Sequence, residues 1–345
     1  MKIYDVIIIG GGQAGLSVAY FLRRTNLEYL ILDKNDKPGG SWLQTWDNLK
    51  LFSPTEYSSL SGWAMPKSEN EYPTKKEFIS YLEKYELRYN FPIERNTIVH
   101  NVTKENNLFQ IETNQGIFYS KKLVSATGTA QFPFTPSYPN QEKYRGIQLH
   151  SLEYRNTSNF NNKNVLIVGG GNSGAQILAE VSKVANTKWV TLHPPHFLPD
   201  DIDGRYLFNE ATQTFLNKSD STKKKKASLS SIVMVQSVKE ARTRNVLNAV
   251  APFESFYEEG VIWKDGSKEK FDIIIWCTGF KANLNHLTSL NIIENNRIKT
   301  THTRSIKEPN LWLIGYGNWT GFASATIYGV GKTARQTVKE IQETT

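Results

Sequence analysis

The sequence predicts an α/β fold with two similar strand–turn–helix–strand units, and three observations support this fold class. The chain has 345 residues, a length that suggests two domains. A β-branched strand, a glycine-rich turn and an apolar helix occur together twice. Elsewhere, apolar strands alternate with helical patterns, which is typical of a doubly wound parallel sheet.

The first unit occupies the N-terminal part of the chain. Residues 4–15 read YDVIIIGGGQAG, in which Gly10, Gly12 and Gly15 form a G-x-G-x-x-G motif. Apolar residues at helical spacing follow, and a second apolar run at residues 29–32 closes the unit. A strand, a glycine turn, a helix and a second strand in this order form the βαβ unit that binds dinucleotides.

The second unit repeats this pattern. Residues 163–174 read KNVLIVGGGNSG, with Gly169, Gly171 and Gly174 at the three glycine positions. A helical pattern and an apolar run at residues 189–192 follow. One such motif is a weak indicator, but two copies, each between a strand and a helix, are a strong one. Two purely structural glycine turns are the weaker interpretation.

These residue types suit a pyrophosphate for physical reasons. The first glycine allows a tight turn, the second lets backbone N–H groups approach the phosphates, and the third lets helix and strand pack closely. The helix N-terminus adds unpaired N–H groups and the positive end of the helix dipole. Both units are therefore predicted to bind dinucleotides.

The two units differ where the second strand ends. Asp33 stands there in the first unit, and a carboxylate at this position accepts hydrogen bonds from the diol of an unphosphorylated adenosine ribose, as in FAD or NAD. Leu192, followed by His193, takes the same place in the second unit. Because neither an acid nor an arginine is present, the sequence leaves the choice between NADH and NADPH open.

The composition is that of an ordinary globular protein, with 39% hydrophobic and 21% charged residues. The net charge is +8, but the longest basic run, residues 223–226, lies in a polar stretch that predicts a solvated loop. The single cysteine, Cys277, excludes an intrachain disulfide, dithiol redox chemistry and a cysteine-based metal cluster within one chain. No apolar run has the length of a membrane helix. We therefore expect a cytoplasmic protein without metal, nucleic-acid or membrane partners.

Three further segments point to one protein family. Residues 38–42 read PGGSW, residues 144–154 read YRGIQLHSLEY, and residues 276–280 read WCTGF. The middle segment matches the pattern Phe-x-Gly-x-x-x-His-x-x-x-Tyr/Phe, with a tyrosine in first place. With both glycine motifs in the same order, the chain resembles the flavin-containing monooxygenases, above all their small bacterial members. The Trp-Pro extension of the Baeyer–Villiger enzymes is absent.

The resemblance implies an α/β fold of two Rossmann-like dinucleotide-binding domains, with the nicotinamide domain inserted in the FAD domain. In this arrangement, residues 1–150 and 281–345 form the two parts of the FAD-binding domain. Residues 155–280 form the NAD(P)H-binding domain, which contains a loop-rich stretch at 200–250. A C-terminal helix is expected over residues 323–343.

The resemblance also assigns cofactor-binding residues. Those for FAD are Gly10, Gly12, Gln13, Ala14, Gly15, Asp33, Gly40, Trp42, Gly128 and Asn318. Those for NADPH or NADH are Gly171, Asn172, Ser173 and Gly174, to which the glycine motif and the strand end add Gly169, Leu192 and His193. Asn318 replaces the aspartate that the family usually presents to the ribityl chain, and its amide can still donate and accept hydrogen bonds.

The sequence shows no catalytic nucleophile. Phe52, in an aromatic-rich stretch, is a candidate wall of the flavin pocket, and ordinary packing is an equally favoured interpretation. We interpret His150 as ordering the chain between the domains rather than as an acid–base catalyst. Arg205, which follows an acidic turn, is a candidate contact for a cofactor phosphate.

The implied activity begins with hydride transfer from NADPH or NADH to FAD. The reduced flavin would then take up O2 as a C4a-hydroperoxide and oxygenate a small molecule, either a soft nucleophile such as a sulfide or amine, or a ketone. One alternative is a flavin oxidase, or a quinone or protein reductase, without oxygen insertion. Another is a nucleotide-sensing regulator without turnover. Family likeness also suggests a homodimer.

Overall fold

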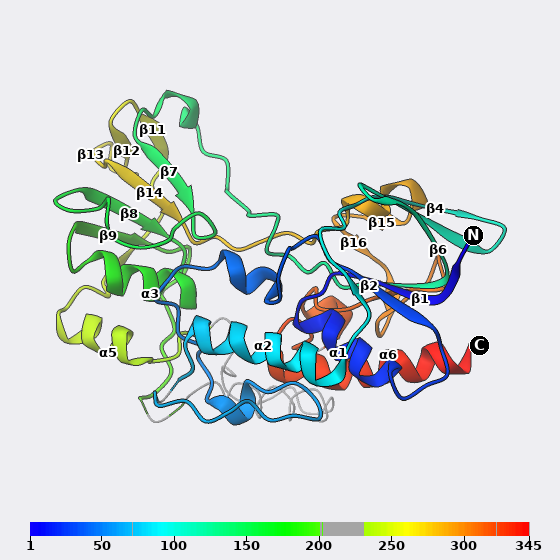
Figure 1. The fold of residues 1–345 in the computed structure, drawn as a ribbon. Coiled ribbons are helices and arrows are strands. Elements are labelled where there is room, and N and C mark those ends of the chain that lie inside the picture. Colours follow the sequence, from blue (N-terminus) through cyan, green and yellow to red (C-terminus); the bar gives the residue numbers. More distant parts are fainter. Residues whose placement is uncertain (71, 201, 203–230, 322, 345) are drawn as a thin grey trace, which may run out of the picture. The chain divides into compact units, whose positions relative to one another are not determined.

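The computed structural model describes residues 1–70, 72–200, 202, 231–321 and 323–344. The chain forms two compact units. The first comprises Met1–Leu43, Pro54–Phe132 and Lys281–Thr345, and the second comprises Gln44–Ser53 and Pro133–Phe280. The second unit is thus inserted in the first, and Figure 1 shows both the blue N-terminal and the red C-terminal segments in the first unit.

In the described part of the first unit, nine strands form one sheet. They are β1 (Ile3–Ile9), β2 (Tyr29–Leu32), β3 (Ile93–Glu94), β4 (Val99–Glu105), β5 (Leu108–Thr113), β6 (Gly116–Ser125), β17 (Thr300–Thr301), β18 (Arg304–Ser305) and β19 (Leu311–Leu313). Their order is β17-β18-β19-β6-β1-β2-β3, and β4 and β5 continue from β6 as an antiparallel meander. All pairs from β19 to β3 are parallel.

The hydrophobic run of β1 explains its central place between β2 and β6. Val6, Ile7 and Ile8 are fully buried, as expected for a parallel strand that is covered on both faces. Ile7 and Ile9 join an apolar core that includes Val102 of β4 and Phe109 of β5. Helices cover the opposite face (Figure 1).

The helices of this unit are α1 (Gln13–Leu22), α2 (Lys75–Tyr89) and α6 (Ile327–Glu343), and α1 contacts both of the others. α2 begins with a capping box, because the Thr74 hydroxyl accepts from the Glu77 N–H and the Glu77 carboxylate accepts from the Thr74 N–H. The shorter elements are the 3-10 helices η1 (Gly40–Gln44), η2 (Thr55–Tyr57), η4 (Asn285–Leu290) and η5 (Asn318–Thr320), and the hairpin of β15 (Ile293–Glu294) and β16 (Arg297–Ile298).

The C-terminal helix starts later than the sequence predicts. Ala323 has a φ of +53°, which no α-helix accommodates, so the expected start at residue 323 is wrong. The Thr326 hydroxyl then accepts a hydrogen bond from the Gly329 N–H at 3.0 Å and caps the helix.

The second unit has a parallel sheet made of β7 (Ile147–His150), β8 (Asn164–Val168), β9 (Asn186–Val190), β10 (Ala249–Val250) and β14 (Ile273–Trp276). The order is β10-β9-β8-β14-β7. A separate antiparallel sheet contains β11 (Ser255–Tyr257), β12 (Gly260–Ile262) and β13 (Lys268–Lys270). The described helices of this unit are α3 (Asn172–Val181), α5 (Gln236–Thr243) and the 3-10 helix η3 (Gln141–Lys143).

The boundary between the units differs from the predicted one. β7 pairs in parallel with β14, so the chain has already entered the second unit before residue 150. Residues 44–53 also group with the second unit, where the Arg155 guanidinium donates to the Gln44 carbonyl at 2.8 Å. These pairings connect residues far apart in sequence, so local patterns cannot reveal them. The stretch predicted as loop-rich contains α5, and residues 203–230 within it lie outside the described residues.

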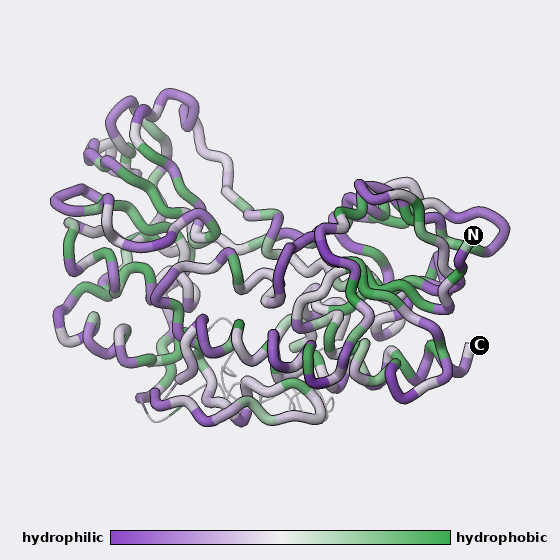
Figure 2. The backbone as a smooth tube through the Cα atoms, in the orientation of Figure 1, coloured by the Kyte–Doolittle hydropathy of each residue, from purple (hydrophilic) through white to green (hydrophobic). Residues whose placement is uncertain are grey.

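Hydrophobic residues concentrate in the strands of both units, as the green segments of Figure 2 show. None of the helices that the structure describes is long and apolar enough to cross a membrane.

Candidate functional site

The glycine turn of the first unit joins β1 to α1, and two of its glycines are required by packing. Gly10 has a φ of +108°, and a Cβ there would lie 2.7 Å from the Ala126 carbonyl oxygen. A Cβ at Gly15 would overlap the Gly10 carbonyl oxygen. These two positions therefore allow the tight turn and the close approach of helix and strand.

The middle glycine leaves the start of α1 open. Gly12 is the N-cap residue, no described side chain caps it, and the first turn contains no acid. Of the described atoms, a Cβ at Gly12 would meet only the Cα of Gly40, at 3.8 Å. Conversely, Gly40 has a φ of +55°, and a Cβ there would lie 2.7 Å from the Cα of Gly12. Both glycines keep this helix N-terminus accessible to an anion.

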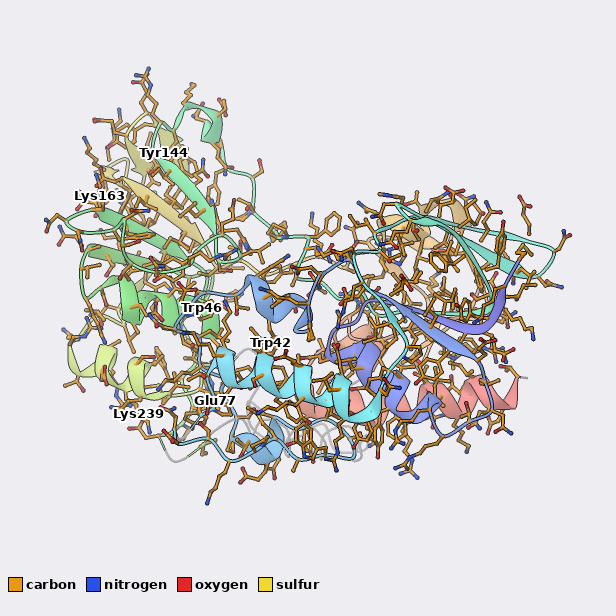
Figure 3. All side chains as sticks on the ribbon, viewed as in Figure 1. Trp42, Trp46, Glu77, Tyr144, Lys163 and Lys239 are labelled. Atoms are coloured by element: carbon orange, nitrogen blue, oxygen red, sulfur yellow. The ribbon has the colours of Figure 1, made fainter. Side chains whose placement is uncertain are left out.

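Gln13 opens α1, and its side chain is already engaged. Its Nε2 donates to the Ala325 carbonyl at 3.0 Å, and its Oε1 accepts from the Trp42 indole N–H at 3.0 Å. Trp42 in turn packs edge-on against Phe78 of α2, and Figure 3 shows Trp42 beside this helix. Gln13 can therefore offer a phosphate its backbone N–H, while its side chain fixes Trp42. The neighbouring Ala14 packs against Gly315, where a Cβ would lie 2.8 Å from the Ala14 Cβ.

Asp33 directly follows β2, as predicted, and is buried at 2% exposure. Its Oδ1 accepts from the backbone N–H and the side-chain amide of Asn35, both at 3.1 Å. Its Oδ2 forms an ion pair with Arg95, which also pairs with Glu86 of α2. Burial raises the pKa of Asp33, and the Arg95 charge opposes this effect. The sequence reasoning missed Arg95 and Glu86, because no motif marks either residue.

Gly128 and Asn318 lie in two loops that follow neighbouring strands, β6 and β19. Gly128 has a φ of +65°, and its carbonyl accepts from the Asn283 N–H at 2.9 Å. The buried Tyr316 hydroxyl links the loops by hydrogen bonds to Ser125 at 2.5 Å and Thr127 at 2.7 Å. Asn318 opens η5 with an exposed side chain.

The second glycine turn, between β8 and α3, repeats the geometry of the first. Gly169 has a φ of +132°, and a Cβ there would overlap the Cys277 carbonyl oxygen. A Cβ at Gly174 would overlap the Gly169 carbonyl oxygen. At Gly171, the N-cap residue of α3, a Cβ would have no neighbour within 4 Å in the part of the chain that the structure describes. This helix N-terminus also has room for an anion.

Asn172, at the start of α3, uses its side chain as Gln13 does in the first unit. Its Nδ2 donates to the Ser231 carbonyl at 3.0 Å, and its Oδ1 accepts from the Val233 N–H at 2.9 Å. Its backbone N–H, like that of the adjacent Ser173, remains at the first turn of the helix. Leu192 and His193 follow β9 and are both exposed, Leu192 at 77%.

The residues of the Phe-x-Gly-x-x-x-His pattern stabilise the second unit. The Tyr144 hydroxyl donates to the Phe271 carbonyl at 2.9 Å, and Figure 3 shows Tyr144 at the sheets of this unit. Gly146 is required, since a Cβ there would overlap the Tyr144 hydroxyl. The Tyr154 hydroxyl donates to Glu180 of α3 at 3.0 Å.

His150 has both ring nitrogens bound to backbone. Nδ1 accepts from the Leu152 N–H at 3.1 Å, which leaves Nε2 to donate to the Gly279 carbonyl at 3.1 Å. Burial lowers the pKa of His150, so the ring is neutral near pH 7. This geometry supports the interpretation that His150 orders the chain. Burial also raises the pKa of the Cys277 thiol to about 12, as expected for an unreactive cysteine.

Phe52 and Arg205 are two further candidate contacts that the sequence predicts outside the glycine turns and strand ends. Phe52 is half-buried and belongs to the segment 44–53 that groups with the second unit, so its role as a flavin-pocket wall stays a prediction. Arg205 and the basic run 223–226 lie outside the described residues.

The structure has two open helix N-termini, each behind a matching glycine turn, and in the first unit a buried acid follows the second strand. These features define a protein class, the oxidoreductases that use FAD and a nicotinamide nucleotide. Residues 7–315 match the pyridine nucleotide-disulphide oxidoreductase family. A flavin-containing monooxygenase from Stenotrophomonas maltophilia is 42% identical, with 100% of this chain and 99% of that one covered and a TM-score of 0.93.

Curated relatives extend the comparison. An uncharacterized oxidoreductase, CzcO, of Bacillus subtilis is 33% identical over 98% of this chain and 99% of its own length. A probable indole-3-pyruvate monooxygenase, YUCCA1, of Arabidopsis thaliana is 26% identical over 98% of this chain and 90% of its own length. The chain belongs to the flavin-containing monooxygenases within the pyridine nucleotide-disulphide oxidoreductase family, and it is an enzyme that uses FAD and NAD(P)H.

Proposed function

We propose that this enzyme uses NADPH or NADH and O2 to oxygenate soft nucleophiles, namely sulfides and amines, and also ketones, through a flavin C4a-hydroperoxide. The observation that carries the proposal is the full-length likeness to a flavin-containing monooxygenase at 42% identity and a TM-score of 0.93. The single cysteine adds support, because a dithiol relay within one chain would need a second one. FAD, when bound, would supply the redox and oxygen chemistry, while the chain would supply binding, orientation and exclusion of water.

In the first unit, backbone and carboxylate groups fit FAD. The open N-terminus of α1 offers its N–H groups to the pyrophosphate, and Gly12 and Gly40 leave the space that the phosphates need. Asp33 would accept from the adenosine ribose diol. Trp42, whose indole N–H donates to Gln13 at the start of α1, would contact the flavin half.

In the second unit, the fit is to a nicotinamide dinucleotide. The α3 N-terminus at Gly171 would hold its pyrophosphate through the N–H groups of Asn172 and Ser173. Leu192 and His193 would lie beside the adenosine ribose without selecting strongly for or against a 2′-phosphate.

The decisive experiment is to reduce the enzyme anaerobically with NAD(P)H and then mix it with O2 while recording the flavin spectrum. We expect a transient absorbance before the oxidised spectrum returns. We also expect one oxygen atom from labelled O2 to be transferred to an added thioether or amine. Direct return to oxidised flavin with hydrogen peroxide as the product would favour the oxidase alternative. Failure of NAD(P)H to bleach the flavin would favour the sensor. A cyclic ketone tested in parallel decides whether the substrate range includes ketones.

A further inference from the structure

An arginine between two buried carboxylates adjoins the predicted FAD site. Asp33 follows β2 and Arg95 follows β3, and these strands are parallel with Leu32 opposite Glu94. The two side chains therefore emerge next to each other at the carboxyl edge of the sheet. Glu86 reaches the same place from α2. Nothing in the glycine motif calls for this arrangement.

The three side chains form two ion pairs that share Arg95. The exposed fractions of the side chains alone are 3% for Asp33, 10% for Glu86 and 19% for Arg95. Arg95 uses Nη1 for Asp33 and Nη2 for Glu86, so its two terminal nitrogens hold different acids. The fork of a guanidinium can span two carboxylates in this way, whereas a lysine ammonium is a single point charge.

The Asp33 carboxylate is thereby fixed against the glycine turn. A Cβ at Gly11 would lie 2.6 Å from Asp33 Oδ2, the oxygen that pairs with Arg95. Asn35 holds Oδ1 from the other side. A carboxylate oxygen has more than one lone pair, so these bonds orient the group without using up its capacity to accept from a ligand.

We propose that Arg95 is a positioning residue for FAD: it holds Asp33 ionised and aligned to accept the hydroxyls of the adenosine ribose, and Glu86 anchors it from α2. This inference rests on the proposed binding of FAD to the first unit. Without Arg95, two carboxylates would share a poorly solvated site without the guanidinium that pairs with both, and Lys34 would be left to act on Asp33 alone. Proton uptake by Asp33 would then remove acceptor capacity that the diol needs.

The test is a double-mutant cycle on FAD affinity, with apoprotein titrated by FAD and flavin fluorescence as the readout. We expect Arg95→Gln and Asp33→Asn each to weaken FAD binding by about 10- to 100-fold, at about 1.4 kcal/mol per tenfold. Because Arg95 acts through Asp33, the double variant should bind FAD no less tightly than the single variant that binds it less tightly. NADH affinity should stay unchanged. Arg242→Gln is the matched control, since it removes an arginine that pairs with Asp200 on the second unit.

Each other outcome has a definite meaning. Wild-type protein that does not bind FAD would refute the proposed function itself. Wild-type binding with unchanged affinity in Arg95→Gln would overturn only this inference, and so would losses that add in the double variant, because Arg95 would then act independently of Asp33. If Arg95→Gln does not fold, a double variant that combines Arg95→Met with Glu86→Leu takes its place. It removes the charges of Arg95 and Glu86 together and leaves Asp33 without the Arg95 guanidinium. Full FAD affinity in that variant would equally overturn the inference.

Discussion

At the scale of single residues, the glycines fall into two groups that a motif does not distinguish. Gly10 and Gly15 are needed by the fold, because a side chain at either would meet backbone atoms. Gly12 and Gly171 have ordinary backbone angles, with φ of −82° and −103°, and space around their Cβ positions. Substitutions at this second group therefore test ligand binding without a large effect on folding.

Gly12→Leu should give a folded, colourless protein. The leucine side chain would occupy the space in front of the α1 N-terminus, where the FAD pyrophosphate is expected. Among the described residues, only Gly40 lies within 4 Å of the Cβ position. Absorbance near the flavin maximum measures occupancy, and urea unfolding checks that the fold is retained. Full FAD occupancy in this variant would disprove the assignment of the first glycine turn.

We predict the nicotinamide preference from the two exposed residues that follow β9. Because neither Leu192 nor His193 strongly attracts or repels a 2′-phosphate, both NADH and NADPH should reduce the enzyme. We expect the kcat/KM values for NADH and NADPH to differ by less than about two orders of magnitude, which corresponds to a difference in activation free energy of under about 3 kcal/mol. Leu192→Arg should shift the ratio toward NADPH by supplying a phosphate contact. Leu87→Arg, an equally exposed leucine on α2, is the control for added charge.

A wild-type preference of several thousandfold for either nucleotide would contradict this expectation. The selecting residue would then lie elsewhere than at the end of β9. Arg205, outside the described residues, is the first candidate to test.

At the scale of elements, the sequence could predict what local patterns encode. The glycine motifs and apolar runs correctly located β1, α1 and β2, and also β8, α3 and β9, since turn chemistry and periodicity act over a few residues. The boundary near residue 150 was wrong, because β7 is placed by its pairing with β14, more than a hundred residues later. Arg95 was missed for the same reason, since it meets Asp33 only through the pairing of β2 with β3.

The start of α2 provides a test at this scale, because this helix carries Glu86. Thr74→Ala removes half of the capping box, so an N–H group at the first turn loses its partner. We expect the free energy of unfolding in urea to fall by about 1 kcal/mol. Thr301→Ala, at an exposed position of β17, should change it by less than about 0.5 kcal/mol. An equal effect of the two substitutions would show that the cap contributes nothing.

At the scale of the whole molecule, one chain forms two compact units with matching glycine turns. Each has its own parallel sheet, its own glycine turn and its own apolar cluster. The inserted unit contains no strand of the first unit's sheet among the described residues. Damage to one glycine turn should therefore leave the ligand of the other in place.

Gly171→Val tests this independence. Among the described residues, a valine at this position has no neighbour within 4 Å of its Cβ, so it should fold, but it would fill the space in front of the α3 N-terminus. The purified variant should be yellow with full FAD, because the first turn is intact. NAD(P)H should no longer bleach its flavin under anaerobic conditions, whereas dithionite, which needs no binding site, should still do so. The reverse pattern, with FAD lost and nicotinamide binding retained, would mean that the second unit holds FAD and that the two assignments must be exchanged.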